Sequence, residues 1–163
     1  FEQAITLFQA AGDSLNEANA CNDLASLFLN KSEYARAEEF YKRALSLREQ
    51  LYGTEHLEVA AVLHNLSNLY RLKGEYEKAE SVGLKAFAIR EREYGSEHPQ
   101  VASTLNVLAI IYYFRGEYDK AAELYHRSLS IREKVLGAEH PSVEIMRRQK
   151  CCFRDLSLSS RRF

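Results

Sequence analysis

Three Glu-His pairs are the residues that most invite a catalytic or metal-binding interpretation. They are Glu55-His56, Glu97-His98 and Glu139-His140, spaced 42 residues apart. Carboxylates and imidazoles bind zinc and transfer protons, but the two-histidine i,i+4 pattern of a zinc helix is missing. Pairs in successive links of a repeat lie too far apart to share one ion. We therefore interpret them as helix-capping and turn residues, and we expect no metal, no cofactor and no catalytic residue.

Other enzyme signatures are also missing from the sequence. There is no nucleophile–base pair, phosphate-binding loop or metal-ligand set. The three cysteines are too few for a disulfide framework, which favours a reducing, cytoplasmic setting. We expect Cys21 to be an inert core residue. Cys151-Cys152 lies beside Arg148 and Lys150, which would lower a thiol pKa, so a redox or lipid-linked role is its less favoured alternative.

Amide side chains form the second set of candidates. Asn22, His64 and Asn106 lie one repeat apart, and Asn65 and Asn68 are neighbours of His64. An amide offers donors and an acceptor, so a ladder of amides could clamp the backbone of an extended peptide. Helix interiors disfavour asparagine, which favours this role over polar filler on a solvated face. For His64 itself we favour an ordinary surface hydrogen bond over a switch.

Composition excludes several classes of protein. The chain has 163 residues, a formal net charge of −1, 46% hydrophobic and 28% charged residues. These values argue against wholesale disorder and against a dedicated nucleic-acid binder. No run approaches the roughly 18 apolar residues of a membrane span. The charge is uneven, however, because residues 147–163 carry six basic and one acidic group, or +5, and the preceding 146 residues carry −6.

An internal repeat organises the chain. Residues 53–94 and 95–136 are identical at 16 of 42 positions without a gap, and 11–52 is a weaker copy. Apolar residues in each unit follow the 3,4 spacing of two amphipathic helices, which we call helix A and helix B. Residues 1–10 resemble the end of a preceding helix B, and 137–163 a trailing capping helix with a basic tail. Stacking of such hairpins predicts a solenoid.

Glycine and proline punctuate each unit. Gly74 and Gly116 suit a turn that needs positive φ, and Ser32 replaces them in the first unit. We expect the glycines at 53, 95 and 137 to close helix B in the αL conformation. Pro99 and Pro141 then fall at the start of the next helix A, where proline is tolerated.

These residues resemble the tetratricopeptide repeat family. The signature of helix A falls on Leu63, Leu66, Ser67 and Tyr70, and again one unit later. The 42-residue unit with its G-x-E-H-P link is similar to the subclass in kinesin light chains and nephrocystin-like proteins. The resemblance implies an all-α, right-handed α-solenoid of helix-turn-helix repeats and a protein-binding role. It covers residues 11–143 well.

In that family the A helices line a concave groove. The resemblance places in the groove those helix A residues that face away from helix B. Lys and Arg of the family's two-carboxylate clamp are missing, which disfavours chaperone C-termini as ligands. Kinesin light chains take acidic peptides with an aromatic anchor, and Arg71, Lys73 and Arg115 could meet such acids, although scattered surface charge is the alternative. The expected groove residues are Asn19, Asn22, Asp23, Ser26, His64, Asn65, Asn68, Arg71, Asn106, Ile110, Tyr113 and Phe114.

Three features need a separate interpretation. Arg48, Arg90 and Arg132 recur at one place in every unit, so we expect exposed inter-repeat contacts with a neighbouring Glu. Gly83 stands where Tyr41 and Tyr125 stand in the other units, and neighbours such as Phe87 filling the space are favoured over a small pocket. In the trailing segment the repeat calls for apolar residues at positions 147, 150 and 154 but finds basic ones. A polar cap is favoured over a basic segment for an acidic partner or membrane surface.

The sequence thus predicts a non-enzymatic scaffold that binds an extended peptide or partner helix. The alternative is self-association, or an intramolecular regulatory or sensor array within a larger signalling protein. The partner's identity does not follow from the sequence.

Overall fold

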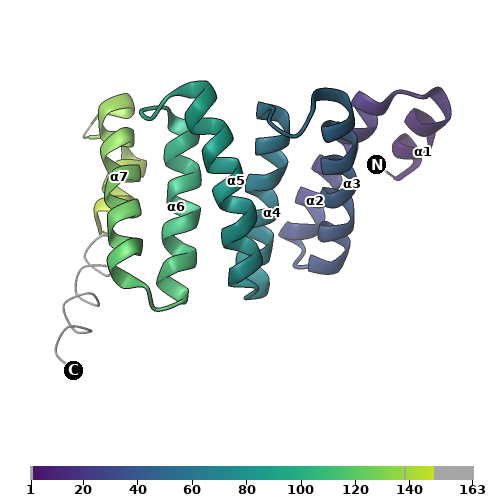
Figure 1. The fold of residues 1–163 in the computed structure, drawn as a ribbon. Coiled ribbons are helices and arrows are strands. Elements are labelled where there is room, and N and C mark those ends of the chain that lie inside the picture. The colour runs from purple at the N-terminus through teal and green to yellow at the C-terminus, as the bar shows by residue number, and fades with distance from the viewer. Residues whose placement is uncertain (1, 138, 149–163) are drawn as a thin grey trace. The chain divides into compact units, whose positions relative to one another are not determined.

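The computed structural model describes residues 2–137 and 139–148 and is all-helical, as predicted (Figure 1). The helices pack in sequential pairs, as in a helix-turn-helix array. Contacts divide the chain into two units, with the boundary between Ile89 and Arg90 inside α5. No helix in the described part of the chain combines the length and apolar character of a membrane span. The helices are α1 (Glu2–Ala11), α2 (Ser14–Asn30), α3 (Tyr34–Tyr52), α4 (Leu57–Lys73), α5 (Tyr76–Tyr94), α6 (Pro99–Phe114) and α7 (Tyr118–Leu136), followed by a helix over 141–148.

Turns within the hairpins have the predicted conformation. Gly74 caps α4 in the αL region with φ 78° and ψ 10°, and Gly116 has φ 79°. Ser32 adopts φ 61°, the same left-handed region without the freedom of glycine.

The prediction for the links between hairpins is wrong in one respect. Gly53 has φ 80° but ψ 168°, and Gly137 has φ 86° and ψ 152°, so neither is in αL. Positive φ combined with extended ψ is a region that only glycine occupies readily. The link turns away from the helix axis at once, instead of continuing through a left-handed cap.

The three histidines of the links cap the following helices, which confirms the capping interpretation. His56 Nδ1 accepts a hydrogen bond from the Glu58 backbone N–H at 3.2 Å. His98 Nδ1 accepts from Gln100 N–H at the same distance, and Pro99 occupies the first turn of α6. His140 repeats the arrangement ahead of residues 141–148.

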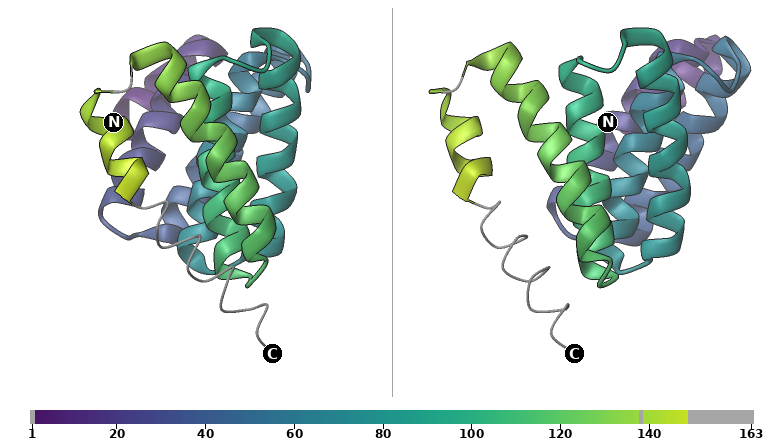
Figure 2. Two further views of the ribbon diagram at one scale, coloured as in Figure 1. Left: turned by 90° about the vertical axis from the view of Figure 1, so that its left-hand side faces the viewer. Right: turned by 60° about the vertical axis from the view of Figure 1, so that its left-hand side comes forward.

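Each unit has its own apolar core. In the first, Val59, Ala60 and Leu63 of α4 pack on Ala86 and Ile89 of α5. In the second, α6 and α7 enclose a cluster that includes Val143 and Met146 of the trailing helix, which lies beside α7 (Figure 2). Both residues are buried, as expected. Gly83 is buried in α5, and the filling of its space by neighbours stays a prediction.

The recurring arginines make inter-repeat contacts, but they are not exposed. Arg48 and Arg90 are each 6% exposed. Arg48 donates to the Glu58 backbone oxygen and pairs with the Glu58 carboxylate, both at 3.0 Å. Arg90 uses no Glu at all, because it donates to Thr104 Oγ1 at 2.8 Å and to a backbone oxygen. These side chains belong to the packed interior.

The trailing helix carries Arg147 at the predicted apolar position. Its guanidinium pairs with Glu133 of α7 at 2.8 Å, so a charge replaces a core residue at the end of the described chain. The predictions for Lys150, Cys151, Cys152 and Arg154, and for the basic tail as a whole, lie outside the described residues.

Candidate functional site

In the first unit the amides of two A helices meet. Asn65 Nδ2 of α4 donates to Asn22 Oδ1 of α2 at 3.1 Å. Asn22 Nδ2 in turn lies 3.5 Å from the exposed Asp23. The predicted amide ladder is therefore a bonded pair in this unit. The spacing of 43 residues is one more than the repeat.

Further along α4, Asn68 orients Arg71. Asn68 Oδ1 accepts from Nε of Arg71 at 3.1 Å and from Nη2 at 2.7 Å. Burial lowers the pKa of Arg71, and the neighbouring Tyr76 and Tyr34 oppose that shift. No carboxylate in the described part of the chain pairs with this guanidinium. Arg71 is thus a half-buried cation aligned by a neutral amide.

Two other predicted residues of this unit are engaged with helix α3. Asn19 Oδ1 accepts from Arg48 Nη2 at 3.0 Å. The Ser26 and Tyr41 hydroxyls lie 3.0 Å apart, and Ser26 also donates to the Asn22 backbone oxygen. The contacts with Arg48 and Tyr41 join helix A to helix B. His64 is half-buried on α4.

The second unit presents a more apolar set on α6. Phe114 is 54% exposed, and its ring meets Tyr113 edge-on with centroids 5.5 Å apart. Tyr113 also contacts the ring of Tyr118 at 5.6 Å. Ile110 and Asn106 are half-buried, and no residue in the described ranges donates to the buried Oδ1 of Asn106. The structure therefore brings Tyr113 and Phe114 together.

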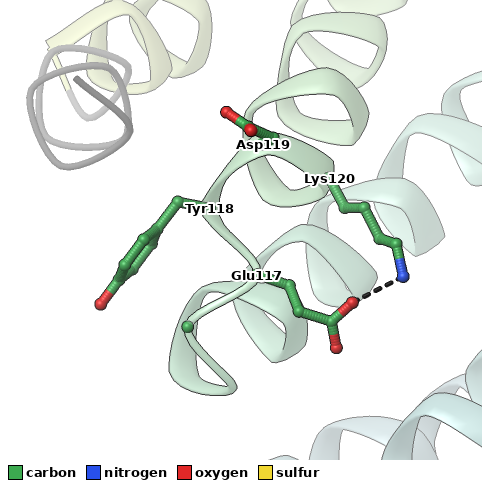
Figure 3. Close-up of a pocket in the computed structure, with 5 residues that line it drawn as sticks. Glu117, Tyr118, Asp119 and Lys120 are labelled. Carbon is green, nitrogen blue, oxygen red and sulfur yellow. Dashed lines mark hydrogen bonds and ion pairs between the residues drawn. The ribbon is translucent and has the colours of Figure 1, made fainter. Parts of the chain in front are cut away.

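A shallow pocket of ≈ 270 Å³ lies at the turn between α6 and α7, lined by residues 116–120. Glu117 pairs with Lys120 at 2.6 Å, and the Tyr118 ring points away from this ion pair (Figure 3). The same Glu117 binds Arg115 at 3.0 Å. These ion pairs use the charged groups of the pocket within the chain.

The sequence analysis missed a recurrent contact at the hairpin turns. A cation lies over the last large ring of each helix A, as Arg36 does over Phe28 at 3.8 Å. The signal was available, since ring, acid and base each recur every 42 residues. The later copies are Lys78 over Tyr70 at 5.7 Å and Lys120 over Tyr112 at 5.2 Å, with Glu33, Glu75 and Glu117 each paired to the base of its unit.

The three cations proposed to meet an acidic ligand differ in what holds them. Lys73 is bonded to Glu38 at 2.6 Å and to Glu75 at 2.5 Å, and Arg115 is held by Glu117. Arg71 alone of the three has no carboxylate partner among the described residues. The candidate face thus consists of Asn22, Asp23, Asn65, Asn68 and Arg71 in the first unit, and Asn106, Ile110, Tyr113 and Phe114 in the second. One groove running through both units stays a prediction.

Sequence comparison identifies the repeat. The chain matches the family model described as tetratricopeptide repeat over residues 18–91, 68–134 and 101–149. The chain belongs to the tetratricopeptide repeat family. Domains of this family are generally protein-interaction modules and are typically non-catalytic. Among curated proteins, no sequence match was found.

Solved structures share the fold at low sequence identity. BtubC (BKLC) from P. vanneervenii aligns with a TM-score of 0.72 and 21% identity over 92% of this chain, which spans 66% of that structure. Kinesin light chain-like repeats from Podosopora anserina, a putative kinesin light chain with nearly identical TPR-like repeats, align with a TM-score of 0.72, 20% identity and coverage of 99% and 86%. A variant of the same Podosopora anserina repeats gives 0.74, 22%, 98% and 81%. At these identities the likeness concerns the fold.

Proposed function

We propose that this tetratricopeptide repeat chain is a non-enzymatic scaffold that binds an extended peptide on the exposed face of its A helices. The observation that carries the proposal is Arg71. A half-buried guanidinium has lost part of its hydration, so a carboxylate from a ligand would restore what burial removed. Asn68 already holds two of its N–H groups in place, which lowers the entropic cost of binding. An acidic side chain is therefore the expected ligand group.

The bonded amides supply contacts that do not depend on the ligand's sequence. The Asn22–Asn65 bond uses one donor hydrogen and one acceptor oxygen, whereas two amides together offer four donor hydrogens and two oxygens. The remaining groups match the alternating N–H and C=O of an extended backbone. The bond also fixes both side chains before the ligand arrives.

An aromatic or large apolar anchor fits the second unit. Phe114 exposes more than half of its surface and is braced by Tyr113. Aromatic residues held rigid by a neighbour are typical binding hot spots. The proposed ligand is therefore an acidic peptide with an aromatic anchor. A cytoplasmic location is part of the proposal, since Cys21 is a free, buried thiol.

A peptide-array screen followed by affinity measurements tests the proposal. The best peptides should lose about tenfold in affinity or more with Arg71→Gln and with Asn65→Ala/Asn106→Ala. The matched controls remove the same groups from exposed places on B helices, namely Lys85→Gln on α5 and Gln50→Ala on α3. Equal binding by wild type, both groove variants and both controls would reject this face as the binding site.

Self-association is a second candidate function, and Leu27 favours it. Leu69 and Ile111, its equivalents one and two repeats later, are fully buried, whereas Leu27 is 42% exposed. A second copy could cover it. If so, light scattering should show a dimer whose population falls with Leu27→Gln, while a monomer at every concentration would reject this function and leave peptide binding unaffected.

A further inference from the structure

The same histidine cap stands at the start of three successive helices. Nδ1 of His56, His98 and His140 lies 3.2 Å from a backbone nitrogen two residues on, that of Glu58, Gln100 and Ser142 respectively. The backbone at His56 and His98 is extended, as helix caps require. In each case the bond satisfies a backbone N–H of the first helical turn, which has no partner within the helix.

Only one charge state of the ring can make this bond. Nδ1 accepts a hydrogen bond when the imidazole is neutral and its proton sits on Nε2, whereas an imidazolium has protons on both nitrogens and can only donate. A positive charge at a helix N-terminus is also repelled by the helix dipole. Protonation therefore removes the cap and places a like charge beside the N–H groups that the cap served.

From this geometry we propose that the three links are an acid-sensitive device, in which protonation of His56, His98 and His140 uncaps the A helices and loosens the array. Imidazoles ordinarily titrate between about pH 5 and 8, so the change falls between about pH 7.5 and 5.5. The inference goes beyond peptide binding and does not depend on it. Repetition matters, because the same small loss at three links adds up along one chain.

Groups facing the histidines must be weighed against this effect. Tyr52 and Tyr94 stack on the rings of His56 and His98 at 4.6 and 4.0 Å, and a cation would strengthen such a stack. Carboxylates nearby would also favour the imidazolium, but three of them already hold cations, in the pairs Glu58–Arg48, Glu97–Lys134 and Glu144–Arg148. Glu55 and Glu139 are exposed and screened by water. Next to His140, the Ser142 hydroxyl lies 2.7 Å from Nδ1. A lost cap and repulsion by the dipole outweigh these opposing terms.

Thermal unfolding of the full chain at pH 7.5 and 5.5 tests the device. We expect the Tm of the wild type to fall by about 5 °C over this range. The triple variant His56→Asn/His98→Asn/His140→Asn keeps an acceptor at each cap but cannot titrate, so its Tm should fall by less than half as much. The matched control His126→Gln removes a histidine of α7 that lies away from the three caps and should behave like the wild type. A triple variant as acid-sensitive as the wild type, or a wild type with no fall in Tm, would overturn the proposal.

Amide hydrogen exchange keeps the test valid if the triple variant does not fold. In the wild type, the protection factors of the Glu58, Gln100 and Ser142 amides should drop several-fold between pH 7.5 and 5.5, while that of Leu66 in mid-helix stays unchanged. Equal behaviour of the capped and mid-helix amides would contradict uncapping.

Discussion

At the scale of single residues, the recurring polar side chains of this protein bond mainly to other parts of the chain. Arg90 is buried, and burial lowers its pKa. Its guanidinium joins α5 to the first turns of α6 through Thr104 Oγ1 and the Gln100 backbone oxygen. A planar fork of donors suits this task, which a lysine could not perform equally. The recurrence of arginine at this place in every unit therefore has a structural cause.

Replacing Arg90 should destabilise the protein strongly. Arg90→Ala removes the buried side chain and leaves two acceptors without their donor, so the free energy of unfolding should fall by about 2–3 kcal/mol. Urea denaturation followed by circular dichroism measures the change. Arg92→Ala is the control, because that side chain is half exposed and pairs with the adjacent Glu93. A similar loss in both variants would contradict the buried role.

At the scale of helices, the ends of each element depend on special backbone conformations. An added Cβ at Gly53 or Gly74 would meet nothing within 4 Å, so substitution tests the backbone alone. Gly53 has extended ψ with positive φ, whereas Gly74 is in αL. Side chains tolerate αL better than the region of Gly53. The two kinds of turn should therefore differ in their need for glycine.

Alanine at these two glycines should separate the two turns. We expect Gly53→Ala to lower the free energy of unfolding by about 2–3 kcal/mol and Gly74→Ala by about 1 kcal/mol. Conversely, Ser32→Gly should raise it by about 0.5–1 kcal/mol, because Ser32 already holds φ 61°. Urea denaturation of the three variants provides the comparison. The reverse order of the two alanine variants would show that the link tolerates side chains.

Contacts between neighbouring hairpins include an ion-pair network centred on Glu38. This carboxylate of α3 binds Lys73 of α4 at 2.6 Å and Lys42 at 2.7 Å, and it accepts from the Tyr70 hydroxyl at 3.2 Å. Burial raises the pKa of Glu38, but hydrogen bonds from Lys42 and Lys73 outweigh burial and lower it from 4.5 to about 2. The same bonds raise the pKa of Lys73. The ionised carboxylate thus stabilises the fold.

Acid should remove this stabilisation in a defined range. Since the pKa of Glu38 is lower in the folded than in the unfolded chain, its contribution is complete above pH 4.5 and is lost as the pH falls toward 2. Glu38→Gln should lower the free energy of unfolding by about 1–3 kcal/mol at pH 7, and the difference from wild type should shrink below pH 4.5. The exposed neighbour serves as the control in Glu39→Gln. Urea titrations from pH 7 to 2 would refute the network if the difference did not depend on pH.

At the scale of the whole molecule, stability comes from units stacked on their neighbours. The second unit has its core completed by the trailing helix, where Val143 is fully buried and Met146 is 5% exposed. The Tyr125 hydroxyl of α7 also donates to the Met146 backbone oxygen at 3.1 Å. Residues 141–148 are therefore part of this core, although Arg147 departs from the repeat.

A cavity in the trailing helix should affect the whole second unit. Val143→Ala should lower the free energy of unfolding by about 2 kcal/mol, as measured by urea denaturation. Ile145→Ala in the same helix is the control, since Ile145 is 57% exposed and its loss should cost less than about 0.5 kcal/mol. If both variants match the wild type, the trailing helix contributes nothing to the core.

The sequence by itself determined the features that depend on near neighbours. The 42-residue period, the helix pairs, the histidine caps and the positive φ of Ser32 and Gly74 follow from residues a few positions apart, whose geometry the local backbone sets. The conformation of Gly53 was predicted only in its sign of φ, because its ψ depends on where the next helix packs.

Only the tertiary structure decided which polar side chains of the candidate site bond to one another. One repeat separates Asn22 from His64, yet its partner is Asn65, because the stacking of α2 on α4 and the side-chain rotamers set the register. Packing likewise buried Arg48 and Arg90, which local sequence treats as surface charges. It also left Arg71 beside an amide while Lys73, two residues on, found Glu38 and Glu75. Distances across helices depend on how whole elements pack, and no spacing along the chain contains that information.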